Sequence, residues 1–310
     1  MASESVLTIF ELPTARRSPF WDSKIWLDYL ALTKPEVNFL IVVTTFAGFY
    51  LARAAGWHDF PFLRSFNTLL GTLFVASGTG TLNQYIERRF DCQMRRTSRR
   101  PLAAGRLNPA AVLWFGIALS LLGTIYLAAA VNLLASLLAL GTLLSYLFFY
   151  TPLKRKSPLC TLVGAFAGAT PPLIGWAAAS GRLSIGAWIL YSVLFLWQFP
   201  HFMSIAWIYR EDYARARYLV LPHGAHSRLR LVNWQTLLPV LLLVPVSLVQ
   251  AVTSKPGAAY YIGTSLLSAG FLYYAVAFVL RKSNAFARQL LSASIIYLPS
   301  LFVLMIAVGK

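Results

Sequence analysis

Apolar runs of about 20 residues recur along the whole chain, and they constrain the fold more than any other feature. Each run is long enough to cross roughly 30 Å of hydrocarbon as a helix. The chain is 58% hydrophobic and only 12% charged, which is about half the charged share of a soluble domain. A transmembrane barrel would instead show short segments of alternating polarity. The sequence therefore predicts an all-α fold, a polytopic membrane helical bundle of about nine transmembrane helices.

Hydropathy places these nine spans, and residues 1–35 form a polar N-terminal cytoplasmic segment before a transmembrane domain over 36–310. The N-terminal segment has no short apolar core with a small-residue cleavage site, so it does not resemble a signal peptide. The predicted spans cover residues 37–55, 66–86, 109–128, 132–150, 159–180, 184–208, 230–251, 259–280 and 290–308.

The distribution of positive charge tests this map of spans. It puts 22 of the 27 Lys and Arg residues on one side of the membrane and the other 5 on the opposite side. Cytoplasmic loops carry the excess of Lys and Arg, so we expect the N-terminus in the cytoplasm and the C-terminus outside, in the cell inner (plasma) membrane. The same bias accounts for the net charge of +17 without nucleic-acid binding.

Three polar residues stand at the end of the second predicted span with the spacing of one helix face. Asn83, Glu87 and Asp91 follow each other at intervals of four, so a helix would carry them in one stripe. Oxygen ligands of this kind suit Mg²⁺, which usually takes one or two carboxylates and leaves room for phosphate. Arginines crowd the next residues, and carboxylate-bound metal with Arg is suited to holding a diphosphate. Simple ion pairs at a helix end are the alternative.

A second cluster closes the fourth predicted span. Pro152 is expected to end that helix after Tyr150, and Lys154 and Arg155 follow at once. The cluster fits plain positive-inside charge. The functional alternative is a diphosphate clamp that combines a compact ammonium with a planar guanidinium.

A third group lies at the end of the sixth predicted span. Trp197 is one turn before His201, and Asp212 follows eleven residues later. If the helix continues through this run, His201 and Asp212 share one face about 16 Å apart. An ionisable residue inside a span suggests function, and a neutral His bonded to a neighbouring helix is the alternative.

Several motifs resemble those of a known family. The run from Asn83 to Gly105, with its R-T-x-x-R-P-L tail, resembles the first signature of the UbiA-type membrane prenyltransferases, and most of all their haem O synthase branch. Similar stretches are Y-x-x-x-K-R-x-S from Tyr150, the glycine-rich pattern over 164–176, W-Q-x-P-H ending at His201, and D-Y at Asp212. The resemblance covers about residues 30–310.

This resemblance implies transfer of the farnesyl group of farnesyl diphosphate to a vinyl group of haem b, with Mg²⁺ as cofactor. It implies a lipid bilayer as the setting, and haem A synthase or a second copy of the chain as candidate partners. The implied catalytic metal ligands are Asn83, Glu87, Asp91 and Asp212. The implied substrate-binding residues are Arg88, Arg96, Arg100, Tyr150, Lys154, Arg155, Trp197 and His201.

The chain departs from the family pattern after Asp212. Members often read D-Y-x-x-A-G-x-P-M-L-P, whereas Arg217 stands here at the Gly position, so the resemblance does not fix the loop conformation. The wider superfamily often has a second acid four residues past Asp212, where this chain has Ala216, which leaves Glu211 as the candidate substitute. Two other functions stay open: prenyl transfer to an aromatic acid or quinone precursor, and a non-enzymatic transporter, which would need charge or broken helices near the membrane midplane.

Overall fold

The computed structural model describes residues 23–53, 60–222, 224–249 and 257–308, and helices joined by loops make up this part of the chain, without a strand in the described ranges. The predicted all-α fold is confirmed. In chain order the helices are α1 (Ser23–Leu32), α2 (Pro35–Leu51), α3 (Phe62–Asp91), α4 (Pro109–Ala130), α5 (Leu133–Leu144), the π-helix η2 (Ser145–Tyr150), α6 (Thr151–Leu153), α7 (Cys160–Gly168), α8 (Pro171–Ser180), α9 (Ile185–Ile208), α10 (Arg210–Arg215), α11 (Ala225–Leu248), α12 (Ala258–Arg281) and α13 (Asn284–Val308).

Helices overlap all nine predicted spans, but fewer are apolar enough to be called membrane-crossing. In the described chain seven segments qualify, and an eighth does if α1 and α2, which meet at 47°, form one broken span. The remaining helix is α3, which is 30 residues long. It falls short because it is rich in Ser, Thr, Asn and Gly, and many of these residues are buried against other helices instead of facing lipid.

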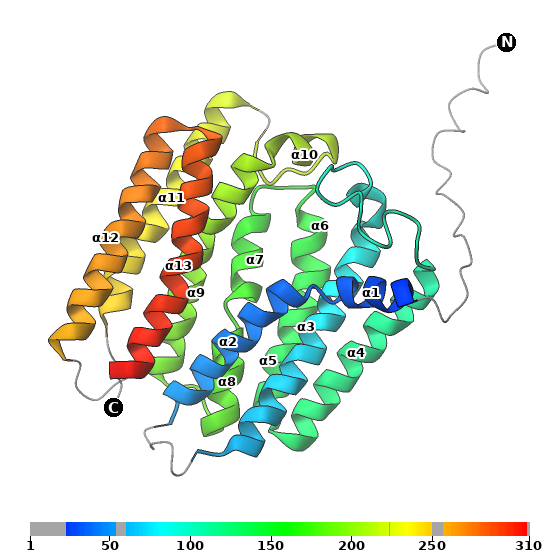
Figure 1. Ribbon diagram of the computed structural model, residues 1–310, viewed down its shortest axis with the longest axis horizontal. Helices are drawn as coiled ribbons and strands as arrows, with labels where there is room; N and C mark the ends of the chain where they lie inside the picture. Colours follow the sequence, from blue (N-terminus) through cyan, green and yellow to red (C-terminus); the bar gives the residue numbers. More distant parts are fainter. Residues whose placement is uncertain (1–22, 54–59, 223, 250–256, 309–310) are drawn as a thin grey trace.

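The helices pack into one bundle (Figure 1), with α11, α12 and α13 at one end of its long axis and α3 and α4 at the other. Between them α2 packs on α8 and α3, and α9 packs on α11 and α13. Small residues permit the close contacts, and several lie in the glycine-rich pattern over 164–176. A Cβ on Gly175 of α8 would overlap the carbonyl oxygen of Thr45 in α2, and one on Gly168 of α7 would overlap the Gln198 side chain of α9.

Loops that are far apart in sequence meet at one end of this bundle, near α6 and α10 (Figure 1). The backbone N–H of Arg96, in the loop after α3, donates to Oδ2 of Asp212 at 3.2 Å. The backbone N–H of Leu219, after α10, donates to the carbonyl of Lys154, after α6, at 2.7 Å. The loop after α3, the segment after α6, and α10 with the loop that follows it therefore lie together.

The fourth span does not simply stop at Pro152 but widens into a π-helix before it. Proline has no N–H to donate to the preceding turn, and a π-turn re-registers the hydrogen bonds. The backbone N–H of Thr151 accordingly bonds to the carbonyl of Tyr146, five residues back. This register turns the Thr151 hydroxyl towards Asn83, whose Nδ2 donates to it at 3.2 Å.

The helix does not continue from His201 to Asp212, so the condition for placing them on one face is not met. Helix α9 ends at Ile208, and Tyr209 leaves helical geometry with φ −103° and ψ 21° before α10 begins. The eleven-residue separation therefore does not put His201 and Asp212 on one helix face.

Candidate active site

The centre of the site is the last two turns of α3. Asn83, Glu87 and Asp91 lie one turn apart on the same helix, and they are only 1%, 5% and 1% exposed. Burying two carboxylates is costly unless each has a charged or hydrogen-bonding partner. Their partners therefore define the site.

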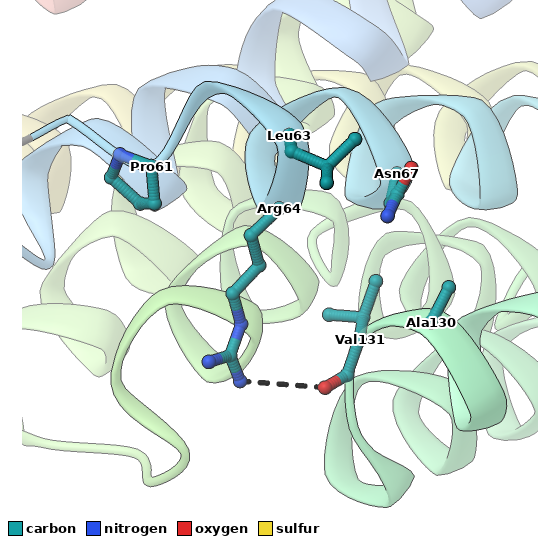
Figure 2. Close-up of a pocket in the computed structure, with 6 residues that line it drawn as sticks. All are labelled: Pro61, Leu63, Arg64, Asn67, Ala130 and Val131. Carbon is teal, nitrogen blue, oxygen red and sulfur yellow. Dashed lines mark hydrogen bonds between the residues drawn. The ribbon is translucent and has the colours of Figure 1, made fainter.

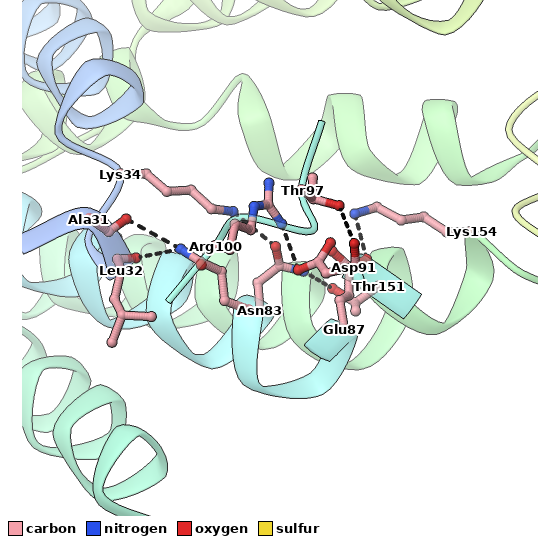
Figure 3. A network of polar contacts seen from close by, with 11 residues as sticks. Ala31, Leu32, Lys34, Asn83, Glu87, Asp91, Thr97, Arg100, Thr151 and Lys154 are labelled. Carbon is pink, nitrogen blue, oxygen red and sulfur yellow. Dashed lines mark hydrogen bonds and ion pairs between the residues drawn. The ribbon is translucent and has the colours of Figure 1, made fainter. Parts of the chain in front are cut away.

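Each member of the stripe contacts a different cation (Figure 3). Nζ of Lys34 donates to Oδ1 of Asn83 at 3.0 Å. Nζ of Lys154 lies 2.7 Å from Oε1 of Glu87. The Arg100 guanidinium lies 2.8 Å from Oδ2 of Asp91. Side chains from α3, from the α1–α2 junction, from the loop after α3 and from the end of α6 thus form one polar network.

Lys34 reaches this network through an unusual backbone conformation. It lies between α1 and α2 with φ 54° and ψ 62°, in the left-handed region that residues with a Cβ rarely adopt. Amide side chains hold the junction in place: Nε2 of Gln84 donates to the carbonyl of Leu32 at 3.0 Å, and Nδ2 of Asn38 donates to the carbonyl of Thr33 at 2.7 Å. Such strain persists only where the surroundings fix it, and it is typical of functional sites.

Lys154 carries its charge in a buried setting. Burial works against the charged amine, but the Glu87 carboxylate and the neighbouring tyrosines outweigh it and raise the pKa of Lys154 well above its ordinary value. The ammonium also lies 4.5 Å from the centre of the Tyr150 ring, a cation–π contact. Lys154 is therefore a fixed positive charge at neutral pH.

Asp212 joins the site from α10. It is 7% exposed, it pairs with the Arg215 guanidinium one turn later, and its other oxygen accepts the Arg96 backbone N–H. Glu211, the candidate substitute for a second acid, is exposed to solvent, while Ala216 is buried. The structure thus gives Asp212 alone a buried carboxylate in α10.

Trp197 and His201 form a separate pair on α9. Their rings stack with centroids 4.7 Å apart. Both side chains bond to one residue of α13: Nε1 of Trp197 donates to the carbonyl of Ser294 at 2.8 Å, and Nδ1 of His201 lies 2.8 Å from Oγ of Ser294.

Comparison with known proteins places this arrangement in a family. The model of the UbiA prenyltransferase family matches residues 41–301. The chain belongs to this family. It is a multi-pass membrane protein, as its helices indicate.

Relatives in the UbiA family share nearly the whole chain. A protoheme IX farnesyltransferase from Solibacter usitatus is 45% identical over 285 residues, which cover 90% of this chain and 97% of the relative. One from Salinibacter ruber is 40% identical over 91% of this chain and 98% of that relative.

Solved UbiA-type structures share the fold at low sequence identity. A structure of digeranylgeranylglyceryl phosphate synthase in membranes superposes with a TM-score of 0.73 at 16% identity, over 92% of this chain and 99% of the other. A UbiA homologue from Archaeoglobus fulgidus bound to GPP and Mg²⁺ superposes with a TM-score of 0.60 at 18% identity, over 90% of this chain and 99% of the other. The UbiA-like fold prediction is confirmed.

The donor set fits a hard cation at one position. Oδ1 of Asp91 is buried without a hydrogen-bond partner, although Oδ2 is paired with Arg100. Such an orphaned carboxylate oxygen is suited to a metal ligand. Within the described ranges no three His, Cys, Asp or Glu residues are gathered closely enough to hold a metal by themselves. Glu87, Asp91 and Asp212 are each held by a cation instead.

The structure brings some of the other predicted residues to this network and leaves some away from it. Arg155 stacks on Phe90 at 4.2 Å from the ring centre, beside the stripe. The Arg96 side chain stacks on Tyr209 at 5.0 Å. Arg88 folds back on its own helix, donating to the Tyr85 carbonyl at 2.6 Å.

Sequence reasoning missed three residues that the UbiA fold brings to the site. Thr151 and Arg215 carry no motif of their own; they contact Asn83 and Asp212. Lys34 had a signal, because Lys34-Pro35 is similar to the family's L-T-K-P opening, but spacing along the chain did not connect it with Asn83, 49 residues away.

A hollow of about 310 Å³ lies elsewhere, between the start of α3 and the end of α4 (Figure 2). Arg64 lines it and donates to the carbonyl of Val131 at 3.4 Å. It is at the opposite end of α3 from Asp91 and includes none of the predicted site residues.

Proposed function

We propose that this chain is a haem O synthase, which transfers the farnesyl group of farnesyl diphosphate to a vinyl group of haem b. The C–O bond between farnesyl and diphosphate breaks, a C–C bond forms to the vinyl group, and water supplies the hydroxyl group of the product while its remaining proton is released. Near-full-length relatives named protoheme IX farnesyltransferase support this reaction and this acceptor.

The observation that carries the diphosphate half of the proposal is the polar network at the end of α3. Lys34, Lys154 and Arg100 contact its amide and its two carboxylates. Buried cations held beside carboxylates are pre-organised for a diphosphate, which needs positive charge where its leaving oxygens develop negative charge. Because this site is largely shielded from solvent, those charges are weakly screened.

Mg²⁺ would be held by the oxygens of Asn83, Glu87, Asp91 and Asp212, and the partnerless Oδ1 of Asp91 supports this. When bound, the ion neutralises diphosphate charge. A UbiA homologue from Archaeoglobus fulgidus has been solved with GPP and Mg²⁺.

The protein's own residues then have distinct parts. Lys154 and Arg100 donate hydrogen bonds to diphosphate oxygens and stabilise their charge as the allylic C–O bond ionises. Arg155 and Arg96 extend this positive surface. We assign Arg88 a more distant contact with the substrate. The face of Tyr150 stabilises the farnesyl cation by about 0.5 to 2 kcal/mol.

The acceptor lies against α9 in this proposal. Trp197 offers an aromatic surface for a flat macrocycle. His201 offers a ring nitrogen to the haem iron. Trp197 is 7% exposed and His201 is half-buried.

We assign the network to the cytoplasmic face of the cell inner membrane, with the C-terminus outside. The basis is the distribution of Lys and Arg. Farnesyl diphosphate and haem b are the proposed substrates, and a contact with haem A synthase or a second copy of the chain is consistent with this location.

Product analysis tests the proposal. Membranes containing the chain, given farnesyl diphosphate and haem b, should yield the hydroxyfarnesylated haem by mass spectrometry. Asp91→Ala should abolish it with the protein still folded, while Glu36→Ala, which removes an exposed acid at the start of α2, should leave it unchanged. Formation of the product at the normal rate by Asp91→Ala would remove Asp91 from the metal site.

A further inference from the structure

We infer that Ser294 of α13 is a positioning residue that holds His201 in the tautomer with the proton on Nδ1, so that Nε2 is free to bind the acceptor. The tautomer assignment stands on the contacts of α9 with α13. Its role towards haem iron rests on the proposed function.

The Ser294 hydroxyl makes two contacts. Oγ lies 2.6 Å from the carbonyl oxygen of Leu291, three residues earlier in α13. It also lies 2.8 Å from Nδ1 of His201. Ser294 is fully buried, so water does not replace either contact.

The hydrogen count decides which atom carries each proton. Two oxygens 2.6 Å apart repel unless a proton lies between them, and a carbonyl has none to give. The hydroxyl proton of Ser294 therefore points to Leu291, a common contact for a serine within a helix. Oγ is then left with lone pairs only and accepts from His201, so the proton of the imidazole must be on Nδ1.

Nε2 of His201 consequently carries the free lone pair. The structure records no hydrogen bond to Nε2 from the residues it describes, whereas Nδ1 is bonded. A neutral imidazole with one nitrogen donating to the protein and the other unprotonated is the arrangement that ligating histidines use, because the bond at the far nitrogen fixes the ring and raises its basicity.

The same residue also holds the stacking partner of this ring. The Ser294 carbonyl accepts Nε1–H of Trp197 at 2.8 Å, and Trp197 stacks on His201 with an angle of 25° between the rings. Ser294 thus fixes both the orientation of the imidazole and the aromatic surface beside it. Because the Trp197 bond uses the backbone carbonyl, a side-chain substitution at Ser294 leaves that bond in place and changes only the Oγ contacts with His201 and with the Leu291 carbonyl.

Solid-state NMR of the full chain in lipid bilayers tests the tautomer without any ligand. The chain has four histidines, so ¹⁵N-histidine labelling gives few signals, and His201→Gln identifies the one that belongs to His201. We expect the Nδ1–H form for His201. Ser294→Ala should shift most of the population to the Nε2–H form, and Ser294→Thr, which keeps a hydroxyl, should retain Nδ1–H.

Ser204→Ala is the matched control. Its hydroxyl donates to the backbone carbonyl of His201 at 2.7 Å, not to the ring, so this variant should leave the tautomer unchanged. An Nε2–H signal in the wild-type chain, or an Nδ1–H signal that persists in Ser294→Ala, would overturn the assignment.

Binding of protohaem IX, without farnesyl diphosphate, tests the role of Nε2. Resonance Raman spectra of the ferrous complex should show an iron–histidine stretch that His201→Gln removes. Ser294→Ala should lower the frequency of this stretch and weaken haem binding about 10-fold. Ser294→Thr should stay close to wild type in both measurements. A wild-type spectrum without that stretch would refute the iron contact, yet the tautomer result would stand. Absence of farnesylated haem in the product assay would instead refute the proposed function.

Discussion

At the scale of single residues, we expect the stability of the site to depend most strongly on the ion pair between Glu87 and Lys154. Both side chains are nearly buried, at 6% and 12% exposure, and their charged atoms lie 2.7 Å apart. Removing one partner of such a pair leaves an uncompensated charge, which costs more than the pair itself contributes.

We therefore expect Lys154→Met to lower the free energy of unfolding by about 3 kcal/mol, seen as a lower midpoint of thermal unfolding in detergent. Adding Glu87→Gln should restore much of the loss, because it removes the unpaired carboxylate. Lys156→Met, at an exposed position two residues away, should have little effect. Equal losses in Lys154→Met with and without Glu87→Gln would contradict the pairing.

The pH dependence of this contribution follows from its sign. The folded pKa of Lys154 is raised above the ordinary value of 10.5. A raised lysine pKa contributes stability that is complete below 10.5 and is lost only as pH rises through the folded pKa. The difference in unfolding midpoint between wild type and Lys154→Met should therefore stay constant from pH 7 to pH 9, measured in the same detergent. A difference that disappears across this range would show that Lys154 loses its charge there.

Arg217 shows the cost of a departure from the family pattern. The family often has Gly at this position, and the chain keeps the backbone that Gly favours, with φ 53° at Arg217. A left-handed conformation costs a residue with a Cβ roughly 1 to 2 kcal/mol. Substitution by Gly relieves this strain, but the greater flexibility of Gly in the unfolded chain offsets part of the gain in stability. Arg217→Gly should therefore be more stable than Arg217→Ala by about 1 kcal/mol in thermal unfolding, because both remove the exposed side chain and only one relieves the backbone. Equal stability of the two variants would mean that the loop relaxes without strain.

The residues of the site differ in how far the sequence could predict them. Asn83, Glu87 and Asp91 were predictable because one helix fixes their relative positions. Lys34 and Ser294 were not, since each meets its partner across dozens of residues through packing of separate helices. The role of Lys34 also depends on a left-handed backbone that no local residue preference favours.

At the scale of elements, close approach of helices depends on single glycines. An alanine at position 175 would place its Cβ on the Thr45 carbonyl oxygen, which is backbone and cannot move away cheaply. We expect Gly175→Ala to cost about 1 to 3 kcal/mol by overpacking, measured by thermal unfolding in detergent. Gly141→Ala is the matched control: position 141 in α5 has open space around it, so the substitution should be neutral or stabilising by up to about 1 kcal/mol. A neutral Gly175→Ala would contradict the α2–α8 contact.

The elements also show where sequence patterns fail. The position of α3 was predicted, but its composition is too polar for a lipid-facing span. Many of its Ser, Thr and Asn residues are buried against other helices, which is why the helix can carry them. The break between α9 and α10 was not predicted, because Tyr209 to Asp212 are all compatible with a helix. A tertiary contact acts there instead, because the Arg96 backbone N–H donates to Oδ2 of Asp212 from the loop after α3.

At the scale of the whole molecule, the side on which the network lies is testable with the natural cysteines. Cys92, in the loop directly after α3, is exposed, and Cys160 is buried. A membrane-impermeant maleimide should label Cys92 in inverted inner-membrane vesicles and not in intact spheroplasts, and Cys92→Ser should abolish the labelling. Labelling of Cys92 in intact spheroplasts would place the network outside and contradict the orientation drawn from Lys and Arg.

The central claim is that α3 and α10 contribute to one diphosphate site. Its most direct test is Mg²⁺-dependent binding of farnesyl thiodiphosphate, an analogue that resists ionisation, to the purified chain by calorimetry. Asp91→Asn and Asp212→Asn should each weaken binding at least about 10-fold, in line with the loss of one ligand or charge contact. The affinity of the double variant should fall by less than the product of the two single effects, because both residues act on the same bound ligand. Glu211→Gln, the exposed neighbour of Asp212, should bind like wild type. Wild-type affinity in Asp212→Asn, or losses that multiply fully in the double variant, would separate α10 from the stripe on α3 and contradict the claim.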